Sequence, residues 1–271
     1  MTIPTTKEIV FITGANTGIG YAAVKSLLQS PKPYHILLGC RSLLKGNAAI
    51  AKLAEETENS HSIVEPVEID ISDDDSIQRA FEMVRDKFGR VDVLVNNAGV
   101  CFDDHFENDG KNFRKIFNET YNVNVAGTQV VTYTFAPLLV KSSAPRLLFN
   151  TSGRSSLAKE AEYDDKASAF GPGWPKGIGG FWLAQGYRCA KVALNMVMVT
   201  WQTILKDDNV KVWCINPGLL ATNLGGSKSR LEKMGAGDPS IGGNLMRQVI
   251  EGERDADVGK VVCRNGGVQA W

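Results

Sequence analysis

The sequence predicts an α/β fold in which helices cover both faces of one doubly wound parallel sheet of about seven strands. Short β-branched runs alternate with helix-length segments along the chain, which is the pattern of right-handed strand–helix–strand crossovers. The predicted strands are apolar throughout, as strands covered on both faces should be. The chain has 271 residues, of which 43% are hydrophobic, so it can bury a large core. We find no internal repeat and no linker, and therefore expect one domain over residues 1–271.

The elements follow one another in a regular order. Strands are expected at residues 9–12, 35–38, 62–69, 91–95, 146–150 and 210–215. Helices are expected at about residues 19–30, 43–56, 72–88, 112–140 and 184–205. Pro31 ends the first helix, the acidic run after Ser72 suits an N-cap, and Gly89 suits a helix stop. Two glycine-rich segments break this order, an insertion at about 153–183 and a loop at about 219–243, and such long irregular segments are usually functional.

Composition and charge exclude several classes of protein. Thirty basic residues balance thirty acidic ones, so no basic excess indicates nucleic acid binding. The apolar runs are strand-sized, which argues against a membrane span or a signal peptide. The five cysteines are scattered without a Cys-x-x-Cys pair, as expected of free thiols in a cytoplasmic protein. His35, His61 and His105 lack ligand spacing, so we expect no metal site.

A glycine-rich turn lies between the first strand and the first helix. Gly14 allows the chain to turn sharply, Gly18 allows the backbone to approach a pyrophosphate, and Gly20 allows close packing of helix on sheet. The free amides at the start of the helix then face the phosphates. The same candidate dinucleotide site includes Asn16, Thr17 and Ile19. The alternative is an ordinary strand-to-helix turn.

The end of the second strand indicates which dinucleotide is bound. NAD sites usually carry an acidic residue there, which accepts a hydrogen bond from the ribose 2′-hydroxyl, whereas an arginine accommodates a 2′-phosphate. Here the chain has no carboxylate and presents Arg41 and Ser42, both able to donate to phosphate. The sequence therefore favours NADP(H); the alternative is a surface arginine and NAD.

Four motifs together resemble the short-chain dehydrogenase/reductase family. In chain order they are Thr13-Gly-x-x-x-Gly-x-Gly20, Asn96-Asn97-Ala98-Gly99, Tyr187-x-x-x-Lys191, and Pro217-Gly218 followed by Thr222. The resemblance spans about residues 7–225, and the long insertion and terminal Trp271 are similar to the carbonyl-reductase subgroup. It implies a Rossmann fold and an oxidoreductase that uses a nicotinamide cofactor.

Tyr187 and Lys191 are the expected proton-transfer pair. Residues four apart share one face of a helix, so both side chains can reach one site. A phenol has a pKa near 10, and we expect the ammonium of Lys191 to lower the pKa of Tyr187. The resemblance also implies that Lys191 hydrogen-bonds the nicotinamide ribose. The alternative is a solvated helix face.

The resemblance implies two further catalytic residues. Ser152, at the end of the fifth strand, would donate to the substrate oxygen, with Ser155 and Ser156 as less suitable neighbours. Asn124 would hold a water that passes protons to the lysine, with Asn122 as its rival. Either asparagine could instead be a helix-interior amide bonded to backbone.

The resemblance also implies the remaining cofactor contacts. Asp70 and Ile71 would bracket the adenine, Asn97, Ala98 and Gly99 would line the adenosine ribose, and Pro217, Gly218, Leu220 and Thr222 would meet the nicotinamide carboxamide. Asp70 could instead begin the cap of the next helix.

The insertion offers a candidate substrate wall. Ser152 and Tyr187 are 35 positions apart, farther than in ordinary family members, and the insertion brings Trp174, Phe181 and Trp182 close to the tyrosine. These aromatic side chains would suit an apolar or ring-containing carbonyl compound. The alternative is that they pack on the core. The glycine-rich loop at 219–243 would form a mobile second wall.

The sequence thus predicts an NADPH-dependent reductase of a ketone or aldehyde, reversible to alcohol oxidation, with tyrosine as proton donor. The alternative from another class is a dinucleotide-binding sensor, or a non-redox enzyme such as a cyclase on the same scaffold. We expect a small-molecule substrate and no nucleic acid or membrane partner. A monomer is expected, with a homodimer as the alternative.

Overall fold

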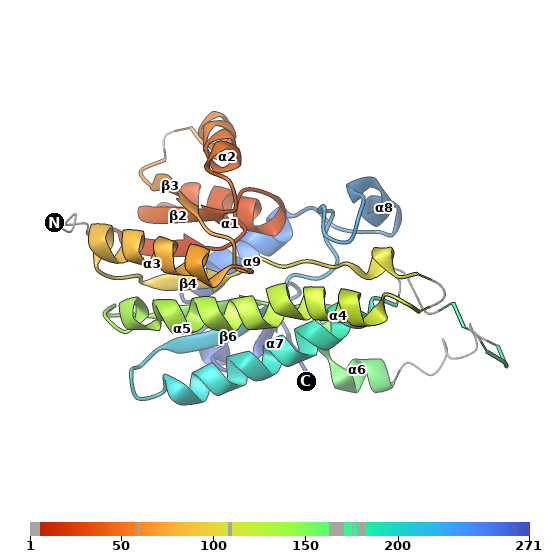
Figure 1. Ribbon diagram of the computed structural model, residues 1–271. Helices are drawn as coiled ribbons and strands as arrows, with labels where there is room; N and C mark the ends of the chain where they lie inside the picture. Colours follow the sequence, from red (N-terminus) through yellow and green to blue (C-terminus); the bar gives the residue numbers. More distant parts are fainter. Residues whose placement is uncertain (1–5, 59, 108–109, 163–170, 175, 178–182) are drawn as a thin grey trace.

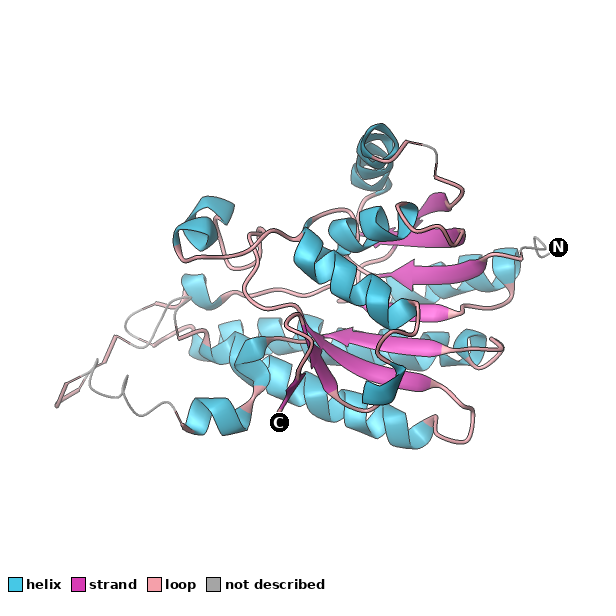
Figure 2. Cartoon of the chain, turned by 180° about the vertical axis from the view of Figure 1, so that it is seen from behind, coloured by secondary structure: helices cyan, strands magenta, loops and turns pink. Residues whose placement is uncertain are grey.

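The computed structural model describes residues 6–58, 60–107, 110–162, 171–174, 176–177 and 183–271. These residues form one sheet of eight strands with helices on both faces (Figure 1, Figure 2). The strand order is β3-β2-β1-β4-β5-β6-β7-β8, and every neighbouring pair is parallel except β7 with β8. The order reverses at β1, as in a doubly wound Rossmann fold. The predicted fold class is confirmed, with eight strands where about seven were expected.

The strands are β1 (Glu8–Ile12), β2 (Tyr34–Cys40), β3 (Ile63–Glu68), β4 (Val93–Asn96), β5 (Arg146–Asn150), β6 (Lys211–Asn216), β7 (Val261–Cys263) and β8 (Val268–Gln269). The helices of the described residues are α1 (Gly18–Leu28), α2 (Leu43–Glu56), α3 (Asp74–Phe88), α4 (Phe113–Tyr121), α5 (Thr128–Leu139), α6 (Leu157–Ala161), α7 (Gln185–Ile204), α8 (Lys228–Lys233) and α9 (Ser240–Ile250). Short turns that bear on the site are η1 (Asp103–His105), the π-helical turn η2 (Asn122–Gly127) and η3 (Gly153–Ser155).

Two hydrophobic cores enclose the sheet. One lies under α3, α5 and α7, where the rings of Phe11 and Phe135 are 4.9 Å apart. The other lies under α1, α2 and α9 and contains Val10 and Ile12. Successive side chains of a strand point to opposite faces, so neighbouring residues of β1 enter different cores. Every hydrophobic position of β1 is therefore buried, which explains its continuous apolar run.

Local capping fixes the helix ends that position the strands. Asp73 caps α3 by accepting a 3.0 Å hydrogen bond from the Asp75 amide. Gly89 ends the same helix in the left-handed region, with φ of 74°, a conformation that glycine adopts without steric cost. Both ends agree with the prediction. Asp70 is not the cap; its carboxylate instead accepts from the Ser72 amide and hydroxyl.

The predicted long helix over residues 112–140 is three elements in one continuous run, α4, η2 and α5. The hydrogen-bond pattern of this helix widens to a π turn where the segment after β3 approaches the helix. A Cβ at Gly127 would lie 2.0 Å from the Ile71 carbonyl oxygen. The helix therefore contacts the β3–α3 connection without a side chain between them.

The C-terminal part has more regular structure than the sequence indicated. Residues 219–243 were expected to be irregular, but they contain α8 and the start of α9. Helix α9 packs against α1, where Gly243 allows contact with the Ala22 backbone. The insertion at 153–183 begins with η3 and α6, and residues 163–170, 175 and 178–182 of it lie outside the described residues.

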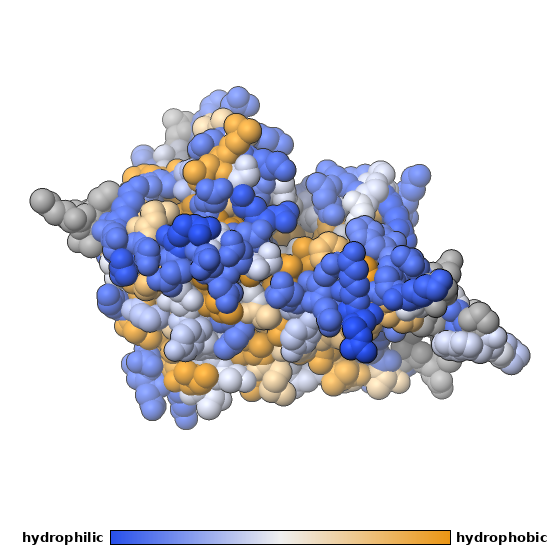
Figure 3. Space-filling model, in the orientation of Figure 1, coloured by the Kyte–Doolittle hydropathy of each residue, from blue (hydrophilic) through white to orange (hydrophobic). Residues whose placement is uncertain are grey.

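The surface over α3 and α8 is mainly hydrophilic, whereas hydrophobic side chains show over α2 and in the hollow between α2 and α8 (Figure 3). Within the described ranges, no helix combines the length and the apolarity that a bilayer crossing requires.

Candidate active site

A cavity of about 1230 Å³ opens at the carboxyl ends of the parallel strands. Its walls come from the β1–α1 turn, the ends of β2 to β6, and the segments around η1 and α8. In an open α/β sheet this edge, beside the strand where the order reverses, is where ligands bind. The cavity is lined by most of the predicted cofactor residues: Gly14, Asn16, Thr17, Gly18, Ile19, Arg41, Asp70, Ile71, Asn97, Ala98, Gly99, Pro217, Gly218, Leu220 and Thr222.

The glycine turn has the geometry that a phosphate site requires. Gly14 and Gly18 have φ of 62° and 58°, a region that favours glycine. A Cβ at Gly14 would lie 2.9 Å from the Ala98 Cα, and one at Gly20 would lie 2.6 Å from the Gly14 carbonyl oxygen. Thr17 precedes α1 without a side-chain cap bond. The first amides of α1 are therefore free to face an anion.

The end of β2 presents a cation to this cavity. Arg41 lines it together with Asp70. Burial opposes the ionisation of Asp70, but hydrogen bonds from Ser72 and the charge of Arg41 lower its pKa. Ser42 differs from the expectation: it does not line the cavity, and its hydroxyl instead caps α2 by accepting from the Lys45 amide at 3.4 Å.

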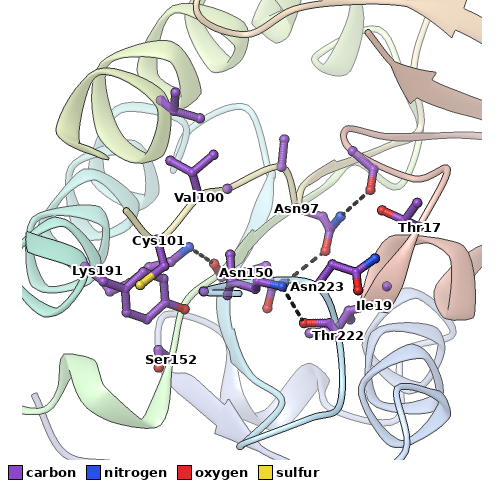
Figure 4. A pocket seen from close by; sticks show the side chains of 18 of the residues that line it. Thr17, Ile19, Asn97, Val100, Cys101, Asn150, Ser152, Lys191, Thr222 and Asn223 are labelled. Carbon is purple, nitrogen blue, oxygen red and sulfur yellow. Dashed lines mark hydrogen bonds between the residues drawn. The ribbon is translucent and has the colours of Figure 1, made fainter. Parts of the chain in front are cut away.

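The Asn96–Gly99 segment is hydrogen-bonded to the glycine turn. Asn97 Nδ2 donates to the carbonyls of Thr13 and Gly14 at 2.8 and 3.1 Å. Asn150 Nδ2 donates to Asn97 Oδ1 at 3.0 Å. Figure 4 shows Asn97 between Thr17 and Asn150, so one amide joins the β1, β4 and β5 ends of the site.

Lys191 lies on α7 at the opposite end of the cavity from Thr17 (Figure 4). Its side chain is buried, and Nζ donates to the Asn150 carbonyl at 2.7 Å. Nζ is 5.6 Å from the centre of the Tyr187 ring. Burial lowers the pKa of Lys191 to about 8. Tyr187, Ser152 and Lys191, three of the four predicted catalytic side chains, therefore line the same cavity.

The Tyr187 phenol is held in its acid form. Tyr187 lines the cavity and is half-buried; burial raises the pKa of its phenol, while the Ser152 hydroxyl acts in the opposite direction. We expected Lys191 to lower the pKa of Tyr187, but desolvation outweighs every opposing contribution. A phenol, a hydroxyl and an amine in one cavity can donate a proton to a reacting oxygen and stabilise negative charge on it.

The two candidate asparagines have different positions. Asn124, at 0% exposure in η2, does not line the cavity. Its side chain donates to the Val100 carbonyl and accepts from the Val100 amide, each at 2.8 Å. Asn122 does line the cavity. The backbone-bonded alternative therefore describes the Asn124 side chain, which fixes the loop after β4.

The substrate side of the cavity was only partly foreseen. Trp174 is 78% exposed and does not line the cavity, so it neither forms a wall nor packs on the core. Phe181 and Trp182 lie outside the described residues. The loop at 219–243 does contribute a wall, as predicted, through Leu219, Leu224, Leu231 and Met234.

Sequence reasoning missed the opposite wall. Cys101, Phe102 and His105 line the cavity, and the Phe102 and His105 rings stack with centroids 5.9 Å apart. The nearby Asp104 carboxylate pairs with Arg230 of α8 at 3.0 Å, which joins the two walls. The sequence signal for this wall was the pair of ring-bearing residues, Phe102 and His105, that follows Asn-Asn-Ala-Gly. Among the described residues, no group of His, Cys, Asp and Glu could hold a metal ion.

Known proteins are similar to this chain in sequence and in fold. The family model for short chain dehydrogenase matches residues 8–163. Short-chain dehydrogenase/reductase tropE of Talaromyces stipitatus is 42% identical over 267 residues, with 98% of each chain covered. Short-chain dehydrogenase/reductase eupG of a Phoma species is 41% identical over 275 residues, again with 98% of each covered.

The fold is similar to that of the NADPH-bound carbonyl reductase from chicken fatty liver, with a TM-score of 0.76 at 22% identity over the whole of both chains. The extent of the family match and the identity to its curated relatives agree with the motifs, and the chain belongs to the short-chain dehydrogenase/reductase family.

Proposed function

We propose that this protein is an NADPH-dependent reductase of a ketone or aldehyde, reversible to alcohol oxidation. The observation that carries the proposal is the meeting of Tyr187, Ser152 and Lys191 in the cavity that also contains the glycine turn. The known family supports an oxidoreductase, and the solved chicken carbonyl reductase, which has the same fold, is NADPH-bound.

The residues present fit a dinucleotide phosphate. Gly14 and Gly20 leave no room for a Cβ, and α1 begins with uncapped amides, which suits a pyrophosphate. Arg41 would hold the 2′-phosphate, because its guanidinium matches phosphate geometry. Asp70 and Ile71 would hold the adenine end, and the 217–222 segment the nicotinamide end. When bound, the reduced nicotinamide supplies a hydride to the carbonyl carbon.

The chain's own groups would complete the reduction at the carbonyl oxygen. Ser152 donates a hydrogen bond to that oxygen and so orients the carbonyl. Tyr187, kept protonated by its raised pKa, transfers its proton as the C=O bond becomes CH–OH. The Lys191 ammonium stabilises the phenolate left behind. Asn124 would act through the loop after β4, which its side chain holds.

The walls favour an apolar or ring-containing substrate. Phe102 and His105 on one side and Leu224 and Met234 on the other supply largely apolar surface. We further propose that the chain forms one domain, since both cores share one sheet. A cytoplasmic location is supported by the five free cysteines. For the assembly we propose a monomer, with a homodimer as the alternative.

The test is the replacement Tyr187→Phe, which removes the hydroxyl and keeps the ring. We expect turnover of NADPH with a panel of apolar and aromatic carbonyl compounds to fall by about 10² to 10⁴-fold. NADPH affinity, followed by fluorescence titration, should stay within about twofold, because the phenol is the group removed and not the phosphate contacts. Tyr133→Phe is the matched control, since Tyr133 is 72% exposed on α5.

Two outcomes would contradict the proposal. Equal turnover in wild type and Tyr187→Phe would show that the tyrosine takes no part in the reaction. NADPH binding without oxidation across the panel would favour a dinucleotide sensor or a cyclase. Running the assay with NADH tests the cofactor choice, and equal kcat/KM with both cofactors would contradict the role of Arg41.

A further inference from the structure

Helix α7, which carries both Tyr187 and Lys191, begins without a capping side chain of its own. Ala184 at the N-cap position has a left-handed backbone, with φ of 46°, and makes no side-chain hydrogen bond. The first amides of a helix have no partner within it. Ala184 and Gly186 are buried, so water cannot satisfy these amides, and another part of the chain must do so.

Asp103 supplies that cap from η1, more than 80 residues earlier in the chain. Its Oδ1 accepts from the Gly186 amide at 2.8 Å and its Oδ2 from the Tyr187 amide at 3.0 Å. These are the second and third helical positions, which an ordinary N-cap side chain would serve. The carboxylate is 0% exposed, so its two oxygens are committed to the helix rather than to solvent.

This site requires a carboxylate. Each oxygen meets one amide, and the positive end of the α7 dipole stabilises the buried negative charge. The Cys101 thiol adds a 3.5 Å contact to Oδ2. An asparagine of the same shape would turn its NH₂ toward one of the two amides and lose that hydrogen bond.

We propose that Asp103 is a positioning residue that fixes the start of α7 and thereby holds the Tyr187 phenol in place against Ser152 and Lys191. This role of Asp103 in the reaction rests on the proposed reductase function. The bond is made to the backbone of Tyr187 itself, so a shift of the cap moves the reacting hydroxyl. Misplacement of a reacting group by about 1 Å can cost about 10²-fold in rate.

The same carboxylate acts on the phenol through its charge. Burial is the main cause of the raised pKa of Tyr187, and the negative charge of Asp103 adds to it. The Ser152 hydroxyl acts in the opposite direction, and the Lys191 amine lies 5.6 Å from the ring centre. Removing the Asp103 charge should therefore lower the pKa of Tyr187, an effect that a purely structural cap would not produce.

The experiment compares Asp103→Asn and Asp103→Ala with wild type. We expect kcat for carbonyl reduction to fall by about tenfold to a hundredfold, with NADPH affinity little changed. The KM for the carbonyl compound should change by less than about threefold, so that the loss appears in kcat and not in KM. Hydrogen exchange, measured on the intact protein, should accelerate at least about tenfold at both the Gly186 and Tyr187 amides in Asp103→Ala, and at one of them in Asp103→Asn.

Asp73→Asn is the matched control, because Asp73 also caps a helix through its carboxylate but on α3. It should leave kcat and the exchange of α7 unchanged. If Asp103→Ala does not fold, the isosteric Asp103→Asn carries the test. Unchanged exchange at the two amides, or a loss of activity that appears in KM with kcat unchanged, would overturn the proposal. A wild type without turnover would contradict the reductase function, whereas the exchange data would still decide whether Asp103 caps α7.

Discussion

The side-chain amine of Lys191 is almost completely buried. It is 3% exposed, and Nζ donates a 2.7 Å hydrogen bond to the Asn150 carbonyl. Burial removes the hydration of an ammonium, and this lowers the pKa of Lys191 to about 8. Protonation occurs below the pKa, so the charge is present below about pH 8 and is lost above it.

We therefore expect kcat/KM for carbonyl reduction to fall as the pH rises through about 8, because the neutral amine no longer stabilises the phenolate. This ratio reports the ionisation of the free enzyme, the state that the structure describes. Lys191→Arg keeps its charge to above about pH 12, so its residual activity should be level over the same range. A wild-type profile without a fall between about pH 7 and 9.5 would contradict this role of the lysine.

The site residues that sequence could identify are those whose spacing is local. Tyr187 and Lys191 share a helix face because they are four apart, and the glycines of the β1–α1 turn lie in one short segment. Asp103 carries no such signal, since its place depends on how the loop after β4 lies against α7. Trp174 shows the opposite kind of error, a residue that was predicted to line the site but is exposed. The nearness of an aromatic residue to a motif in the sequence does not reveal which way its side chain points.

At the scale of elements, the pattern predicted α4, η2 and α5 as one helix and could not show the π turn. A π turn adds a residue to one turn and leaves the apolar stripe nearly in register. Its position is set from outside, where the chain after β3 meets Gly127. Strand β7, with three residues, and strand β8, with two, were missed because such short runs have no readable period.

Gly127→Ala tests this close contact. Gly127 has φ of −60°, which any residue adopts, and alanine is the better helix former by about 1 kcal/mol. Its Cβ would nevertheless lie 2.0 Å from the Ile71 carbonyl oxygen, and the backbone must shift. We expect a net loss of about 1–3 kcal/mol in the free energy of unfolding, read as a lower Tm, and a higher KM for NADPH because Ile71 lines the cavity.

Gly177→Ala is the control for this substitution, since nothing lies within 4 Å of a Cβ there. An unchanged Tm and KM in Gly127→Ala would show that the β3–α3 connection yields without cost, and would contradict a rigid contact between η2 and the adenine end of the site.

At the scale of the whole molecule, the site depends on the sheet's last strand, far from every motif. Gln269 of β8 is 3% exposed and accepts from Asn216 Nδ2 at 2.8 Å. Its own amide donates to the Ser152 carbonyl at 3.2 Å and to Ser155 Oγ at 3.1 Å. Asn216 in turn accepts from the Gly218 amide at 3.0 Å. One buried side chain thus joins the serine loop to the segment proposed to hold the nicotinamide.

Removing this bridge should affect both ends of the cavity at once. We expect Gln269→Ala to lower kcat by about tenfold, because Ser152 loses its backbone anchor, and to cost about 1–3 kcal/mol of stability from the polar groups left unpaired. Gln269→Glu should also be impaired, since a carboxylate cannot donate to the Ser152 carbonyl.

Val268→Ala is the control, because the Val268 side chain on the same strand is 46% exposed, and this variant should leave kcat and Tm unchanged. Steady-state kinetics and thermal unfolding measure both effects. If Gln269→Ala loses stability but keeps full kcat, β8 supports the sheet without holding the serine, and the link between this strand and the reaction is wrong.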